Sequence, residues 1–127
     1  MTTLHHISQL GPAFLSTPFR RYPLGPQAAY IHACCLAGKL MKAGIIDLYA
    51  PIVHGFGIAK YGDIDPFDND FWLRAYRGQL ERAAVLLVGK LPGYMDSDGI
   101  REEINCFELA GKPVFEVCPE TLEVRAA

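Results

Sequence analysis

Glu103 is the residue whose type and position point most directly to chemistry. Ile100, Ile104 and Phe107 follow the i, i+4, i+7 spacing of a helical stripe that faces the core. At roughly 100° per residue, Glu103 lies about 60° from the centre of this stripe, so its side chain is half turned inward. The N–H groups and dipole at a helix start stabilise a carboxylate anion, and a partly shielded anion can act as a glycosidic nucleophile. The alternative is a structural role, in which Glu103 interacts with its own helix terminus or with a surface arginine.

Several other side chains are of types that bind ligands. Ser97 and Gly99 lie at the start of the same expected helix, where free N–H groups favour an anion. Ser97 is equally suited to be a plain helix cap. The aromatic rings of Phe19, Trp72 and Tyr94 could stack on a nucleobase, although each could also be ordinary core or lid packing.

Histidines and cysteines give weaker indications. His54 follows an expected strand and could hydrogen-bond a ligand or transfer a proton near neutral pH, or it could simply hold loop backbone. The four cysteines lack the C-x-x-C spacing of zinc or redox sites, and we expect them to be reduced core residues. We therefore expect no metal site.

Composition limits the possible size and partners of the protein. The chain has 127 residues, of which 50% are hydrophobic, so we expect one domain over residues 1–127, with residues 1–10 flexible. The net charge of -2 argues against duplex nucleic acid as the main partner and favours a small molecule. No apolar run is long enough to span a membrane, and the N-terminus lacks the layout of a secretory signal. These features predict a cytoplasmic protein.

The elements that must position these residues alternate along the chain. We expect strands near residues 13–16, 45–49, 84–88 and 113–117, and helices over 27–43, 71–82 and 98–110. Residues 53–70 are expected to be the longest irregular section, and the end of the chain an extra strand or a surface tail. Strands that are apolar on both faces favour a parallel sheet covered on both sides. The sequence thus predicts a small doubly wound, flavodoxin-like α/β domain of four to five strands flanked by helices.

In such folds, ligands bind at the carboxyl ends of the strands. The segments that follow the expected strands there are Ser16 to Phe19, Pro51 to Gly57 and Leu91 to Glu103.

The segment around Glu103 also resembles a known family. Ser97, Gly99 and Glu103 form S-x-G-x-x-x-E after a hydrophobic strand and the turn Pro92-Gly93-Tyr94. This resembles the catalytic segment of the nucleoside 2-deoxyribosyltransferase and nucleotide N-glycosidase superfamily, in which the glutamate attacks C1′ of the sugar. The segments FLSTPF (14–19), YAPIVH (49–54) and GKPV (111–114) are similar to those of a small bacterial and phage branch of it. Together they span about residues 13–117.

The resemblance implies cleavage or transfer at the N-glycosidic bond of a nucleoside or nucleoside 5′-monophosphate. Glu103 would form a glycosyl-enzyme intermediate, and no cofactor would be needed. Relatives form homodimers or larger homo-oligomers in which a neighbour can complete the site, so the same is expected here. The residues expected to bind the substrate are Ser16, Thr17, Pro18, Phe19, Trp72, Gly93, Tyr94, Ser97 and Gly99.

Two positions depart from the family pattern. Tyr76 aligns with an aspartate that assists the leaving base, and Ala84 replaces a second aspartate. A neutral phenol is a poor proton donor, so a catalytic role for Tyr76 would be weak. The alternative functions are a nucleotide-binding or sensing protein that has lost the chemistry, and cleavage of the nicotinamide bond of NAD. The residues that could replace the missing acid are Asp65, Asp68, Asp70 and His54.

Overall fold

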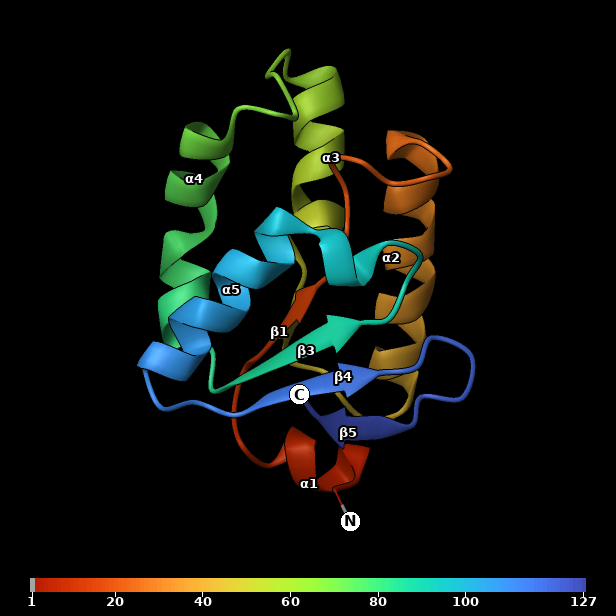
Figure 1. Ribbon diagram of the computed structural model, residues 1–127, viewed down its shortest axis with the longest axis vertical. Coiled ribbons are helices and arrows are strands. Elements are labelled where there is room, and N and C mark those ends of the chain that lie inside the picture. Colours follow the sequence, from red (N-terminus) through yellow and green to blue (C-terminus); the bar gives the residue numbers. More distant parts are fainter. Residues whose placement is uncertain (1) are drawn as a thin grey trace.

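A five-stranded sheet lies at the centre of the computed structural model, which describes residues 2–127 (Figure 1). The strand order is β2-β1-β3-β4-β5, and all neighbouring pairs are parallel except β4 and β5. This confirms the α/β fold and shows that the end of the chain is a fifth strand. The strands are β1 (Ala13–Ser16), β2 (Leu48–Tyr49), β3 (Val85–Gly89), β4 (Val114–Val117) and β5 (Val124–Ala126).

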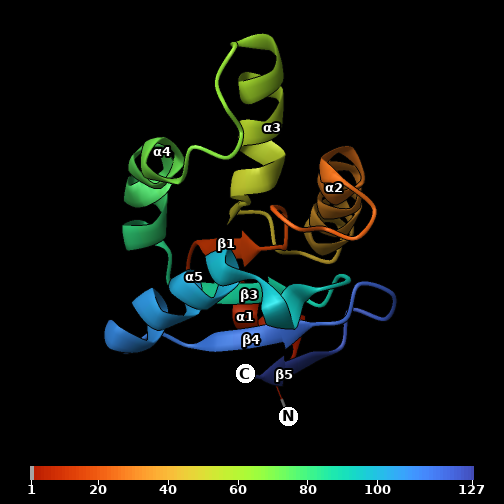
Figure 2. The ribbon, with the colours of Figure 1, turned by 45° about the horizontal axis from the view of Figure 1, so that its top comes forward.

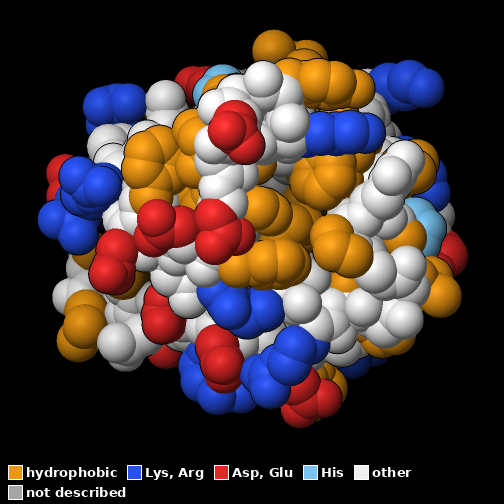
Figure 3. Space-filling model, turned by 90° about the horizontal axis from the view of Figure 1, so that it is seen from above, with side chains coloured by type: hydrophobic (Ala, Val, Ile, Leu, Met, Phe, Trp, Pro, Cys, Tyr) orange, Lys and Arg blue, Asp and Glu red, His pale blue; other side chains and the backbone are white. Residues whose placement is uncertain are grey.

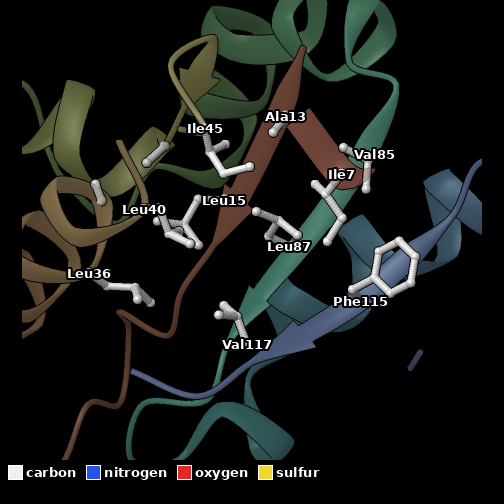
Figure 4. Close-up of a cluster of buried hydrophobic side chains, with 12 residues drawn as sticks. Ile7, Ala13, Leu15, Leu36, Leu40, Ile45, Val85, Leu87, Phe115 and Val117 are labelled. Carbon is white, nitrogen blue, oxygen red and sulfur yellow. The ribbon is translucent and has the colours of Figure 1, made fainter. Parts of the chain in front are cut away.

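Helices cover both faces of this sheet, as expected of a doubly wound fold. On one face, Leu15 and Leu87 pack with Ile7 and Leu40 from two helices, α1 and α2 (Figure 4). On the other face, Phe14 and its neighbours pack against α4 and α5. The helices are α1 (Leu4–Ser8), α2 (Pro26–Lys42), α3 (Pro51–Tyr61), α4 (Asn69–Arg82) and α5 (Asp98–Leu109), with a 3-10 turn at Tyr94–Asp96.

The ends of these helices follow from local sequence. Pro26 occupies the first turn of α2, where its missing N–H costs nothing. Beyond the C-terminus of α2, Gly44 has a φ of +109°, a conformation that other residues rarely adopt. In α5 the hydroxyl of Ser97 accepts a hydrogen bond from the Ile100 N–H at 3.3 Å. The role of Ser97 as a helix cap is therefore confirmed.

The prediction of an irregular section at residues 53–70 is wrong for most of these residues. Helix α3 occupies residues 51–61, α4 begins at Asn69, and only residues 62–68 lie between them. The reason is that Gly55 is not a loop residue but a packing residue. A Cβ built at Gly55 would lie 3.1 Å from a ring carbon of Trp72 on α4. This close approach explains a glycine within a helix, where it costs about 1 kcal/mol relative to alanine.

The expected flexibility of the N-terminus is also wrong for the residues that the structure describes. Residues 4–8 form α1, and Thr3 caps it by accepting a hydrogen bond from the His6 N–H at 3.2 Å. Ile7 is fully buried against the sheet, a burial that stabilises the fold by about 2 kcal/mol. Met1 lies outside the described residues.

Two further findings concern the cysteines and the membrane. All four cysteines are free thiols, as expected, but none is buried in the core, because two are exposed and two are half-buried. Within residues 2–127, the helices are too short or too polar to cross a membrane.

Candidate active site

A cleft of about 990 Å³ opens at the carboxyl ends of β1 and β3. Its lining comes from the loop after β1, from α3 and α4, and from the segment that leads into α5. Figure 2 shows these helices around the strand ends. Seen from above in Figure 3, apolar side chains gather near the centre of this face, with charged side chains around them. This is the edge of the sheet at which the sequence predicted the site.

Glu103 lines the cleft although it is a buried residue, with 7% of its surface exposed. The inward orientation predicted from the helical spacing is therefore confirmed. Burial raises the pKa of Glu103 to about 7, against an ordinary value of 4.5, and the nearby Glu102 adds to the shift. Glu103 is the sixth residue of α5, beyond the first turn where the helix dipole acts most strongly. Desolvation therefore outweighs the stabilisation of the anion that the sequence analysis expected from the helix start.

Two hydroxyl groups from distant parts of the chain lie at the Glu103 carboxyl. Ser16, the last residue of β1, is completely buried and donates a hydrogen bond to Glu103 Oε1. The hydroxyl of Tyr76 on α4 lies near the same carboxyl. Both hydroxyl groups lower the pKa of Glu103, but by less than burial raises it. The carboxyl is thus fixed in position at the edge of the cleft.

The pKa of the Tyr76 phenol is also shifted by its surroundings. Burial, followed by the negative charges of Glu103 and Glu102, raises its pKa above the ordinary value of 10.0. The ring packs beside Phe14, with 5.9 Å between centroids. Tyr76 therefore keeps its proton at physiological pH and leaves Glu103 with a neutral hydroxyl as its neighbour.

Most of the predicted substrate-binding residues lie together. Ser16 is the exception within the first strand segment, because its side chain contacts Glu103 rather than the open cleft. The predicted residues that line the cleft beside Glu103 are Thr17, Pro18, Phe19, Trp72, Tyr76, Gly93, Ser97 and Gly99.

Two predicted residues lie elsewhere. His54 is exposed on α3, and its ring lies 5.3 Å from the ring of Tyr49 rather than at the cleft. Tyr94 packs against the core on the α4–α5 face and lines a separate, smaller hollow with His32 and Lys39. Neither side chain is placed to reach Glu103 through the cleft.

The three aspartates proposed as substitute acids have different surroundings. Asp68 caps α4 by accepting a hydrogen bond from the Phe71 N–H at 3.2 Å. Asp65 accepts one from the Phe67 N–H at 2.9 Å. Asp70 is the one of the three that lines the cleft, and it is exposed.

Arginines at the cleft were missed by the sequence analysis. Arg21 and Arg101 both contact Asp98, at 3.2 and 3.3 Å. Arg20 donates to the Phe67 carbonyl oxygen at 2.6 Å, and its guanidinium lies 5.2 Å from the Phe67 ring centre. Arg20 and Arg21 directly follow the predicted strand-end segment, so extending that segment by two residues would have found them.

Aromatic rings form one wall of the cleft. Phe19 lies between Phe56 of α3 and Phe67, with centroid distances of 6.1 and 5.4 Å. The Trp72 Nε1–H donates to the Asp65 carbonyl oxygen at 2.9 Å, which fixes the indole. Phe56 lies within the predicted segment Pro51 to Gly57 but was not singled out, and it lines the cleft from α3.

Two polar features complete the description. Thr17 is buried at the cleft, and within residues 2–127 its hydroxyl has no hydrogen-bond partner. In the same part of the chain, no three His, Cys, Asp or Glu side chains converge in a way that could hold a metal ion.

Comparison with known protein families gives a match over most of the chain. Residues 11–118 match a family described as a domain of unknown function, DUF1937. The matched segment contains Ser16, Tyr76 and Glu103 and leaves out α1 and β5. A comparison with curated proteins finds no match.

Proposed function

The chain belongs to the DUF1937 family, and we propose that it cleaves or transfers the N-glycosidic bond of a nucleoside or nucleoside 5′-monophosphate. The observation that carries this proposal is the buried Glu103 carboxyl, which accepts a hydrogen bond from Ser16 at the edge of a large cleft. The S-x-G-x-x-x-E resemblance to nucleoside 2-deoxyribosyltransferases supports the same chemistry.

Glu103 would act as the nucleophile. Its carboxylate would attack C1′ of the sugar, the base would leave, and water or a second base would then release the sugar from the carboxyl. A nucleophile fixed by the hydrogen bond from Ser16 loses little freedom on reaching the transition state. The carboxylate would also stabilise the positive charge that develops on the sugar ring.

The ionisation of Glu103 sets a condition on this chemistry. Since burial raises its pKa to about 7, roughly half of the free protein carries the reactive carboxylate at neutral pH. We therefore expect activity to increase as the pH rises through 7.

The cleft has suitable places for the other parts of a nucleotide. Its volume of about 990 Å³ is at the upper end of the roughly 300–1,000 Å³ typical of ligand pockets. The N-terminus of α5, with Ser97 and Gly99 in the lining, favours an anionic group such as a 5′-phosphate. The aromatic wall of Phe19, Phe56 and Trp72 is suited to stack on a base.

The direct test is the release of free base from a panel of nucleosides and 5′-monophosphates, measured by chromatography at pH 8. The expected result is release by the natural protein and none by Glu103→Gln. Glu108→Gln is the matched control, because Glu108 is an exposed residue of the same helix outside the cleft. Absence of release at any protein concentration would contradict the proposal.

A second candidate function is nucleotide binding without turnover. The observation that favours it is the raised pKa of Tyr76. A phenol that holds its proton so strongly is a poor acid for a leaving base. This alternative predicts that a nucleotide raises the melting temperature although no base is released.

A further inference from the structure

A second cavity lies at the carboxyl ends of β3 and β4, where folds of this kind bind ligands. Its volume of about 550 Å³ is within the roughly 300–1,000 Å³ typical of ligand pockets. Lys90 directly follows β3, and His32 and Lys39 come from α2. We call this cavity, lined by His32, Lys39 and Lys90, the basic hollow.

The basic hollow is distinct from the cleft that contains the proposed nucleophile. Pro92 and Gly93 line both cavities, so the two lie on either side of this turn. Glu103 and the three arginines line the cleft and not the hollow. A molecule in the basic hollow would therefore be a second ligand rather than the substrate.

The two lysines give the basic hollow a positive charge. Among residues 2–127, neither ammonium group has a carboxylate within 4.0 Å. Lys39 Nζ donates to the Pro119 carbonyl oxygen at 2.9 Å, which uses one of its three N–H groups and fixes its position. The one carboxylate that the lining contains within residues 2–127 is the exposed Glu120, which accepts a hydrogen bond from a cysteine thiol at 3.2 Å. The excess of positive charge favours an anion.

His32 adds a neutral donor to these charges. Its Nδ1 lies 2.8 Å from the hydroxyl oxygen of Tyr22, a buried residue. Burial raises the pKa of Tyr22, so the phenol keeps its proton and donates it to the nearest acceptor, Nδ1. The neutral imidazole then carries its own hydrogen on Nε2. His32 thus offers an N–H group to the hollow.

Apolar side chains complete the wall of the basic hollow. Leu91, Pro92 and Tyr94 line it beside the charged groups. A bare inorganic ion would leave these surfaces in contact with water, whereas a ligand with a ring could cover them and stack on Tyr94. The lining therefore favours a molecule that has an anionic end and an apolar end.

A phosphate group matches the donors better than a carboxylate does. A phosphate monoester carries a charge of about -1.5 to -2 at neutral pH and has three acceptor oxygens. It can thus pair with the separate point charges of Lys39 and Lys90 and still accept a hydrogen bond from His32. A carboxylate has a single charge and lacks the third oxygen.

From the two unpaired lysines, the oriented imidazole and the apolar wall, we propose that the basic hollow binds a phosphate monoester of a small aromatic group. This site lies outside the proposed glycosidic centre, and its existence does not depend on that chemistry.

The first experiment follows the His32 ring by long-range ¹H–¹⁵N NMR while phenyl phosphate is added to the full chain at pH 8. His32→Gln identifies the His32 signals. We expect an imidazole with its hydrogen on Nε2, and a saturable shift of its signals as phenyl phosphate binds. The signals of His54, which lies outside the hollow, should not move. An unresponsive His32 ring would overturn the proposal.

The second experiment compares ligands of different chemistry at constant ionic strength. Phenyl phosphate is tested against inorganic phosphate, benzoate and benzyl alcohol, with the His32 shift as the measurement. We expect the Kd of phenyl phosphate to be at least about tenfold lower than that of each other compound. Equal affinity for benzoate would overturn the assignment to a phosphate. Equal affinity for inorganic phosphate would overturn the role of the apolar wall.

The third experiment removes the charges one at a time. Lys39→Gln and Lys90→Gln should each raise the Kd of phenyl phosphate about tenfold, because each removes one charged hydrogen-bond donor. Lys39→Arg keeps the charge and should retain most of the affinity. Lys42→Gln is the matched control, because Lys42 is exposed on the same helix and lies outside the hollow. Unchanged affinity in both Lys39→Gln and Lys90→Gln would overturn the proposal.

A variant of the cleft shows which cavity holds the phosphate. Arg21→Gln removes a cation that lines the cleft alone, so it should leave the His32 titration unchanged. Weakening by Arg21→Gln as large as that by Lys90→Gln would place the phosphate in the cleft and overturn the second site. Thermal melts verify folding, and Lys90→Gln keeps the test valid if loss of the bond from Lys39 to Pro119 unfolds Lys39→Gln.

Discussion

Ser16 donates a hydrogen bond to Glu103 across the interior of the molecule, from the end of β1 to the second turn of α5. Both side chains are buried, and 87 positions in the sequence separate them. The bond gives a desolvated carboxyl one fixed partner in a place where an unpaired one would be costly. The ionisation of Glu103 therefore links the stability of the fold to the chemistry that we propose for the cleft.

The first prediction concerns stability against pH. The folded pKa of Glu103 is about 7 and its ordinary value is 4.5, so the folded state favours the protonated form. The resulting stabilisation is fully present below pH 4.5 and is lost as the pH rises to 7, by about 3 kcal/mol in total. Glu103→Gln should remove this loss. Urea unfolding of both proteins at pH 5 and pH 8 measures it.

The comparison isolates this carboxyl because all other titrating groups are common to both proteins. We expect the free energy of unfolding of Glu103→Gln, relative to that of the natural protein, to be higher at pH 8 than at pH 5. A constant difference between the two proteins at both pH values would contradict the raised pKa.

The second prediction concerns the hydrogen bond from Ser16. Ser16→Ala removes a group that lowers the pKa of Glu103, so the midpoint of its titration should move to a higher pH. The midpoint can be followed by NMR of the Glu103 side-chain carboxyl carbon, whether or not the protein turns over a substrate. Ser8→Ala is the control, because Ser8 is exposed and its hydroxyl donates to the His5 carbonyl oxygen, far from Glu103 in the sequence. An unchanged midpoint in Ser16→Ala would show that the bond has no effect on the carboxyl.

The third prediction compares two glycines of α3. Gly55→Ala places a Cβ 3.1 Å from the Trp72 ring, so the indole must shift and stability should fall by about 1–3 kcal/mol. Gly57→Ala meets no atom within 4 Å and should gain up to about 1 kcal/mol from helix propensity. Thermal unfolding measures both, and Trp72 fluorescence reports the displacement. Similar stability changes in the two variants would mean that α3 does not pack against α4 as described.

The fourth prediction concerns the unpaired hydroxyl of Thr17. Thr17→Val removes a buried polar group that has no partner among residues 2–127, so stability should rise by about 1 kcal/mol. Thr121→Val is the contrasting variant, because the Thr121 hydroxyl accepts a hydrogen bond from the Glu123 N–H at 3.2 Å. That variant should lose stability. A lower melting temperature for Thr17→Val would indicate that its hydroxyl does have a partner.

Features that depend on neighbouring residues could be predicted from the sequence. The inward orientation of Glu103 needs only the spacing of Ile100, Ile104 and Phe107 along one helix. The β3 strand could be predicted because its residues are buried on both faces and are therefore apolar without alternation. The edge of the sheet at which the cleft lies follows from this topology.

Features that depend on distant residues could not be predicted. Nothing near Glu103 in the sequence indicates that Ser16 is its partner or that desolvation dominates its ionisation. Helix α3 was missed because Gly55 and Gly57 are typical of loops, and the contact that explains Gly55 is made by Trp72 of another helix. The burial of Ile7 likewise depends on a sheet surface formed by residues much later in the chain.

The two outermost strands of the sheet, β2 and β5, have only two and three residues. An edge strand exposes unpaired N–H and C=O groups that can recruit a strand from another molecule. Such short edges offer few of these groups, so sheet-to-sheet growth between copies of this chain is disfavoured.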